Sequence, residues 1–154
     1  MALFSQVVTH FNEWMAILVW CSLVFMLGSA VGSFLNVCVG RIPTEKSIFW
    51  PTSRCPVCLS PIRAKHNIPV LGWLFLRGKC YDCKTKISFR YPLAEIGTGL
   101  GFVALFYLEI IANIHSIPFL TDARADIIMG VIPWKAWVLF LHHAILLSFL
   151  ITVA

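Results

Sequence analysis

Residues 14–40 read WMAILVWCSLVFMLGSAVGSFLNVCVG, a stretch without a single charged side chain. About 20 helical residues cross a hydrocarbon core of roughly 30 Å, so this stretch is long enough to span a bilayer with some tilt. It is too long for a cleaved signal peptide, and no basic segment precedes it. The stretch therefore predicts a first transmembrane helix.

The rest of the chain has the same apolar character. Of its 154 residues, 59% are hydrophobic and 12% are charged, with a mean hydropathy of +0.84, which excludes a soluble globular protein. We therefore expect an all-α polytopic membrane protein with about three transmembrane helices. Its expected segments are 1–40 with the first helix, a basic loop at 41–91, a second helix at 92–112, a loop at 113–135 and a third helix at 136–154, where the chain ends earlier than expected.

Basic and acidic residues are unevenly distributed along the chain. Ten basic and three acidic residues, a net +7, lie between Arg41 and Glu95, whereas the two basic and four acidic residues elsewhere sum to −2. Basic loops stay in the cytoplasm, so we expect the 41–91 loop there and the N-terminus and the 113–135 loop outside. Membrane lipid is an expected partner of the basic loop, since anionic head groups attract such charges. The loop lacks the aromatic platform of single-strand binders, so no nucleic acid is expected.

Four of the six cysteines occur at two identical spacings, CPVC at 55–58 and CYDC at 80–83. Each two-residue spacer lets a tight turn aim both sulfurs at one metal about 2.3 Å away, and two such turns complete a tetrahedron. The sequence therefore predicts one zinc ion bound by Cys55, Cys58, Cys80 and Cys83.

The competing interpretation of these cysteines is a pair of disulfides, which would need an oxidising compartment, and the predicted cytoplasmic location favours zinc. Four protein ligands leave no open position, so the metal is expected to be structural and to fold the loop. His66 is interpreted as an ordinary loop histidine, and Cys21 and Cys38 as small hydrophobic residues. The basic neighbours that would offset the negative tetrathiolate centre are Arg54, Lys79, Lys84 and Lys86.

Small and polar residues recur at helical spacing near the inner end of the first span. Gly28, Gly32, Asn36 and Gly40 lie four residues apart on one face, where a neighbouring helix could pack closely. An amide at membrane depth also needs partners and often marks a functional interior. A packing seam and a functional role for Asn36 therefore both stay open.

The second span begins with a comparable polar segment. Pro92 suits the first helical position, and Glu95 in the first turn would be favoured by the helix dipole, so capping is one interpretation of Glu95. The alternative is a polar cluster of Asn36, Arg41, Arg90 and Glu95 at one cytoplasmic depth.

Two further patterns concern helix packing. Gly97 and Gly101 repeat the small-residue spacing and predict a tight packing face on the second span. In the third span, His142 and His143 point about 100° apart on a helix. We therefore expect interior packing or an interhelical hydrogen bond from them, and no joint metal chelation.

Four segments together resemble one family, the type IV prepilin peptidases, which cleave and N-methylate type IV pilin and type II secretion pseudopilin precursors. The segments are GSFLNVCVGRIP (32–43), SRCPVCLSPI (53–62), NIPVLGWLFLRGKCYDCKTKIS (67–88) and FRYPLAE (89–95), in the family's order and spacing. The resemblance implies a multi-pass protein of the bacterial inner membrane with a cytoplasmic zinc-binding loop. It also implies prepilin or pseudopilin precursors as partners, an aspartic endopeptidase with two membrane-embedded aspartates, and S-adenosylmethionine as methyl donor.

The sequence departs from this family at the proteolytic site. No GxGD motif occurs, and the chain ends where the first family aspartate is expected. Asp122 and Asp126 match no family motif and fall in the predicted external loop, so we interpret them as solvated carboxylates. We therefore expect no proteolytic residue in this chain.

The favoured hypothesis is an N-terminal region of a prepilin leader peptidase and N-methyltransferase, with the remaining C-terminal helices of the enzyme as a partner. If methyl transfer takes place here, the candidate residues are Gly32, Asn36, Arg41 and Glu95. The alternative is a non-enzymatic membrane protein whose zinc loop binds pilin precursors or assembly partners.

Overall fold

The computed structural model describes residues 2–50, 52–116, 127 and 129–153. Within these ranges the chain is helical and has no strand beyond two isolated β-bridges. Three helices are long and apolar enough to cross a membrane, at His10–Thr44, Arg90–Ile111 and Trp134–Thr152. The predicted all-α architecture with three membrane helices is confirmed, while Asp122 and Asp126 lie outside the described residues.

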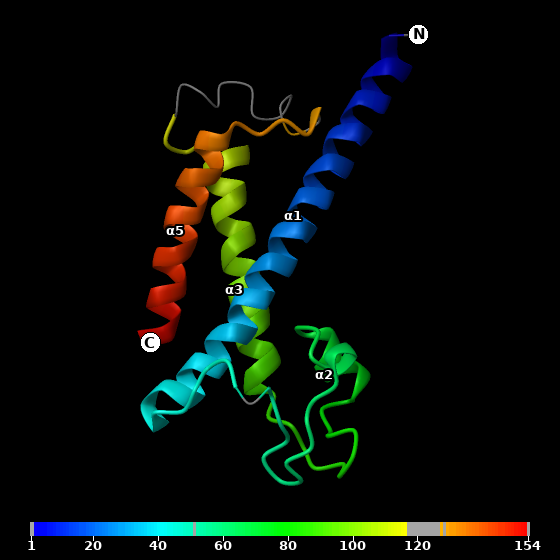
Figure 1. Ribbon diagram of the computed structural model, residues 1–154. Coiled ribbons are helices and arrows are strands. Elements are labelled where there is room, and N and C mark those ends of the chain that lie inside the picture. Colours follow the sequence, from blue (N-terminus) through cyan, green and yellow to red (C-terminus); the bar gives the residue numbers. More distant parts are fainter. Residues whose placement is uncertain (1, 51, 117–126, 128, 154) are drawn as a thin grey trace.

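The first helix, α1, runs from Ala2 to Arg41. It therefore begins well before the uncharged stretch at 14–40. No glycine or proline occurs before Gly28, so nothing in the sequence breaks the helix over its first turns. At the other end Pro43 falls in a 3-10 turn, η1 (Ile42–Thr44), which closes the helix. Figure 1 shows α1 as the longest element, crossing the other two helices obliquely.

The second membrane helix comprises α3 (Arg90–Phe106) and a π-helical turn, η3 (Tyr107–Ile111). Because α3 begins at Arg90, Pro92 is its third residue, where a missing N–H costs no intrahelical bond. Glu95 then lies beyond the first turn, so the predicted capping of its own helix by Glu95 is wrong.

The third membrane helix is α5 (Trp134–Val153), which packs beside α3. The long connection between α1 and α3 carries a 3-10 turn, η2 (Ala64–His66), and a five-residue helix, α2 (Leu71–Phe75). Figure 1 places this whole connection at one end of the three helices.

Glycines bring α1 and α3 into close contact. A Cβ added at Gly28 would lie 2.8 Å from the Cβ of Phe102 and 2.9 Å from the Cα of Gly99. One added at Gly32 would lie 3.0 Å from the Cα of Glu95. The predicted seam is therefore present at Gly28 and Gly32, where the two backbones approach too closely for side chains.

Not all of the glycines predicted to pack closely do so against α1 or α3. Gly40 and Gly97 have no neighbouring atom within 4 Å of an added Cβ, and Gly101 meets Leu147 of α5 at 3.0 Å. The glycine of α3 that faces α1 is Gly99, where an added Cβ would lie 2.6 Å from the Ser29 hydroxyl. Of the two glycines predicted to form a tight packing face, Gly101 therefore packs closely against α5, whereas Gly97 does not pack closely.

The core between the helices is aromatic. Phe106 of α3 and Phe140 of α5 are fully buried and meet edge to face, with ring centroids 6.1 Å apart. Nearby, His143 Nδ1 of α5 lies 2.6 Å from Oε1 of buried Glu109 in η3. The expected interhelical contact is therefore made by His143, whereas His142 is exposed.

Candidate metal centre and the cavity beside it

The two cysteine segments fold into the same short hairpin. In the first, the Cys55 N–H donates to the Ser60 carbonyl at 3.0 Å; in the second, the Cys80 N–H donates to the Thr85 carbonyl at 2.8 Å. An isolated antiparallel bridge closes each hairpin, between Arg54 and Pro61 and between Lys79 and Lys86. The repeated spacing in the sequence therefore corresponds to a repeated backbone structure.

Each hairpin contains one residue in the left-handed conformation. Leu59 has φ +57° and Lys84 has φ +59°, and each immediately follows the second cysteine of its hairpin. Their N–H groups donate to the carbonyls of Cys55 and Cys80, at 2.9 Å and 3.2 Å. A non-glycine residue in this conformation costs roughly 1–2 kcal/mol, and the turn that aims both sulfurs in one direction requires it.

The four thiols converge on one point. All four sulfurs lie within 4.8 Å of one another, with 3.7 Å between Cys55 and Cys83 and 3.9 Å between Cys58 and Cys80. A tetrahedron with metal–sulfur bonds of about 2.3 Å places its sulfurs about 3.8 Å apart, whereas a disulfide needs about 2.05 Å. The cysteines are free thiols, and their arrangement could hold a metal ion.

One thiol in each hairpin has a shifted pKa, and the two shifts have opposite directions. Hydrogen bonds from the Ser60 side chain and backbone lower the pKa of Cys58 to about 6. At Cys83, a backbone hydrogen bond from Thr85 lowers the pKa, but desolvation and the neighbouring sulfurs raise it further, to about 12. Because like charges oppose one another, all four thiols can ionise together only with a cation among them.

Tyr81 organises the outer side of the second hairpin. The Arg63 guanidinium lies 4.1 Å above its ring, and the same guanidinium is 3.7 Å from Asp82. The Lys84 ammonium donates to the Tyr81 carbonyl at 2.7 Å. His66 packs its ring 5.0 Å from that of Tyr81, outside the cluster of four cysteines that could hold a metal.

Trp73 of α2 fixes the second hairpin from its inner side. Its indole N–H donates to the Ile87 carbonyl at 3.2 Å, and its ring meets Phe89 edge to face at 5.4 Å. Gly78 lies beneath the same ring with φ +65°, and a Cβ there would be 2.6 Å from Trp73. Only glycine satisfies both constraints at this position.

A buried carboxylate joins the loop to the membrane helices. Glu95 of α3, 8% exposed, accepts a hydrogen bond of 2.7 Å from the N–H of Val70, the residue before α2. Asn36 of α1 donates to the Tyr91 carbonyl at 3.2 Å, and Arg41 donates to the Ser47 carbonyl at 2.9 Å. Asn36 thus links α1 to the start of α3, and Arg41 holds the segment that follows α1.

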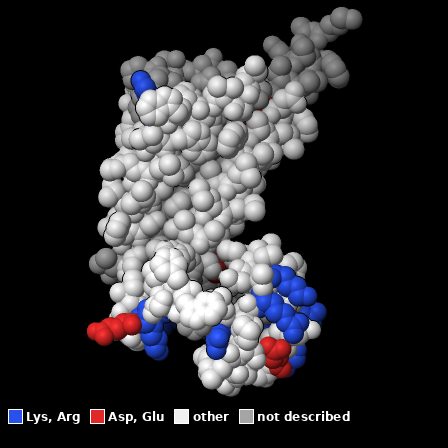
Figure 2. Space-filling view, viewed as in Figure 1, with Lys and Arg blue, Asp and Glu red and all other residues white. Residues whose placement is uncertain are grey.

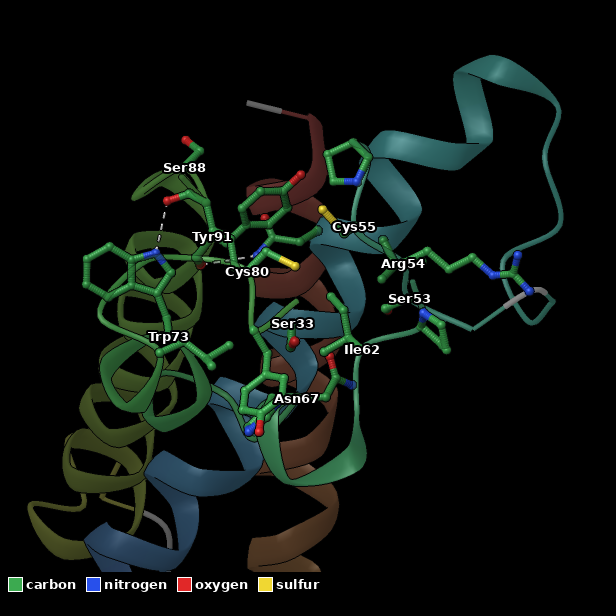
Figure 3. A pocket seen from close by; sticks show the side chains of 18 of the residues that line it. Ser33, Ser53, Arg54, Cys55, Ile62, Asn67, Trp73, Cys80, Ser88 and Tyr91 are labelled. Atoms are coloured by element: carbon green, nitrogen blue, oxygen red, sulfur yellow. Dashed lines mark hydrogen bonds between the residues drawn. The ribbon is translucent and has the colours of Figure 1, made fainter. Parts of the chain in front are cut away.

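A cavity of about 670 Å³ lies between the hairpins and the ends of α1 and α3. Figure 3 shows its wall, where Ser33 of α1, Asn67 and Trp73 of the loop and Tyr91 of α3 surround the space. Of the predicted polar cluster, Asn36, Arg41 and Glu95 line the cavity.

The methyl-transfer candidate Gly32 and the remaining cluster member, Arg90, lie elsewhere. Gly32 packs against Glu95 and Thr98 in the helix seam. Arg90, at the first turn of α3, is exposed and does not line the cavity. Sequence reasoning missed Val70 and Tyr91, which act through backbone atoms that residue identity does not reveal.

The comparisons with known proteins agree with the motifs. The family model for the bacterial peptidase A24 N-terminal domain matches residues 26–109. The prepilin leader peptidase/N-methyltransferase of Myxococcus xanthus is 52% identical over 81 residues, covering 53% of this chain and 24% of that protein. The protein of the same name from Klebsiella pneumoniae is 44% identical over 95 residues, covering 58% of this chain and 42% of that protein.

The chain therefore spans less than half the length of these curated relatives. No solved structure matches it.

Proposed function

Since the chain belongs to the bacterial peptidase A24 N-terminal domain family, we propose that it is the N-terminal region of a prepilin leader peptidase and N-methyltransferase. Its substrates would be type IV pilin or type II secretion pseudopilin precursors, presented at the bacterial inner membrane. One observation carries the proposal: the matched segments, far apart in the sequence, line one cavity where two membrane helices meet the four-cysteine loop.

The metal of the loop would be zinc. The sulfur separations of 3.7 Å and 3.9 Å fit a tetrahedral tetrathiolate site, which is typical of structural zinc. Cys55, Cys58, Cys80 and Cys83 would all be ligands, which leaves no position for substrate or water. Zinc would thus clamp the two hairpins together and hold the loop side of the cavity in place.

The cavity would receive the precursor segment that is processed. Asn36 and Glu95 already bond to backbone groups, so we assign them positioning roles that hold the helix ends and α2 around the cavity. Arg41 lies on the wall and offers further N–H donors to a bound peptide. If S-adenosylmethionine is the methyl donor, these same residues would surround it.

Proteolysis would need carboxylates from outside the segment described above. Asp82 lies beside the metal ligands, 3.7 Å from Arg63, and the 154 residues contain no GxGD motif. We therefore propose that the remaining C-terminal helices of the enzyme supply the aspartate pair. The net +7 charge between Arg41 and Glu95 favours a cytoplasmic location for the cavity.

Photo-crosslinking tests whether the cavity receives a precursor. A photoreactive amino acid replaces Ser33, which lines the cavity, or as a control Leu150, which is 68% exposed on α5. Each variant is reconstituted in vesicles with a purified prepilin. We expect a prepilin adduct from position 33 and none from position 150. Equal adducts, or none from position 33, would contradict the proposed site.

A further inference from the structure

The outer face of α2 is apolar although the helix belongs to a basic loop. Leu71, Leu74 and Phe75 are 47%, 55% and 70% exposed, and no polar side chain occurs in the segment LGWLF. A helix that faces water carries polar residues on its outer side. An exposed group of large apolar side chains instead marks a surface that binds another apolar surface.

The hydrogen bond between Val70 and Glu95 fixes the depth of this helix. Glu95 is the sixth residue of α3, so at 1.5 Å per residue it lies about 7.5 Å along the axis from Arg90, where the apolar span begins. The start of α2 is held at this level. Figure 1 accordingly shows α2 beside the first turns of α3 and not beyond the end of the helix.

A second apolar segment lies close to the end of α1. Phe49 and Trp50 are 80% and 72% exposed. Arg41 donates to the carbonyls of Ser47 and Ile48 at 2.9 Å and 3.4 Å, which turns this segment back toward the helix. Tryptophan is enriched at the boundary between lipid and water, where its ring reaches apolar chains and polar head groups together.

Charge on the loop complements a lipid surface. Arg77 and Lys79, both exposed, directly follow α2 in the chain. Figure 2 shows Lys and Arg side chains gathered mainly at the loop end of this face, while the flanks of the helices are white. Long basic side chains can place their charges among phosphates while their stems stay in the apolar layer.

We propose that α2, with Phe49 and Trp50, inserts into the leaflet next to the loop, at the boundary between anionic head groups and acyl chains. The metal-binding loop then lies against the bilayer and does not project freely into water. Lipid is the occupant that fits, because the apolar face is held level with the first turns of the apolar span of α3 and positive charge follows it directly. The inference requires the membrane spans of α1 and α3 but not the proposed enzymatic function.

Fluorescence quenching by brominated lipids tests this insertion. The full chain, in nanodiscs that contain anionic phospholipid, carries an encoded fluorescent amino acid in place of Phe75. The matched control carries it in place of Val57, which is 66% exposed on the first hairpin. We expect bromines near the head groups to quench position 75 at least threefold more strongly than position 57. Equal quenching at both positions would overturn the proposal, as would the absence of quenching at 75.

A second pair of variants tests the insertion of α2 without a fluorophore. Leu74→Glu places a charge on the apolar face, and Val57→Glu places the same charge on the hairpin. If α2 lies in lipid, Leu74→Glu should increase the rate of loop proteolysis in nanodiscs at least fivefold over Val57→Glu, and the two variants should converge in detergent micelles. Equal rates in nanodiscs would show that a protein surface or water, and not lipid, faces α2.

Discussion

Replacing Glu95 with alanine should release α2 from the membrane helices. The carboxylate is 8% exposed and accepts the Val70 N–H at 2.7 Å. A hydrogen bond to a charged group contributes about 1.5–3 kcal/mol, which corresponds to a roughly 10- to 150-fold change in an opening equilibrium. The equilibrium constant for local opening of α2 should therefore increase by that factor, while α1 and α3 remain inserted in the membrane.

Hydrogen exchange of the chain in nanodiscs measures this opening directly. Peptides that cover residues 68–76 should exchange faster in Glu95→Ala by the factor given above, and peptides within α5 should not change. Glu95→Gln keeps an acceptor oxygen, so its exchange rate for residues 68–76 should lie between those of the unchanged chain and Glu95→Ala. Exposed Glu45 provides a matched control, because its removal should leave these peptides unaffected. Unchanged exchange of 68–76 in Glu95→Ala would refute the assigned role of this carboxylate.

Three further predictions concern the helix seam, the metal and the topology. Gly99→Ala should lower the thermal unfolding midpoint in detergent, since overpacking costs about 1–3 kcal/mol. Gly97→Ala should raise the midpoint through helix propensity, because an added Cβ there meets no atom within 4 Å. Equal shifts in the two variants would contradict the assigned packing of Gly99 against α1. Elemental analysis should find about one zinc per chain. The Cys58→Ser variant should expose the loop to protease while the helices stay inserted. Iron in the elemental analysis, or a protease digest that Cys58→Ser leaves unchanged, would argue against a structural zinc site. A reporter fused after Lys65 should lie in the cytoplasm and one fused after Ser116 outside, and the reverse result would revive the disulfide interpretation.

The sequence was most informative where chemistry depends on residue type and spacing. The cysteine spacing predicted a four-sulfur cluster, and the uncharged stretch at 14–40 predicted the first membrane helix. Both features arise from local constraints, namely the reach of two thiols across a tight turn and the length of a helix in a bilayer.

Contacts that depend on the relative rotation of two helices were harder to predict. Gly97 and Gly99 are equally small, and only the packing of α3 on α1 selects Gly99. Glu95 was interpreted as a cap of its own helix or as a cavity residue, yet its partner is the backbone of Val70, 25 residues earlier. Backbone donors carry no signature in residue identity, so sequence patterns could not point to this link between loop and membrane.

Cleavage of a prepilin is the measurement that tests the central claim most directly. Vesicles carry residues 1–154 alone, or residues 1–154 joined to the C-terminal helices of the Myxococcus xanthus relative, and both receive the same prepilin. An aspartic mechanism requires two carboxylates within hydrogen-bond reach of one water, so the chain alone should release no leader peptide and the joined chain should release it. Specific cleavage by residues 1–154 alone, lost in Asp122→Asn or Asp126→Asn, would contradict the account, and so would failure of the correctly inserted joined chain to cleave.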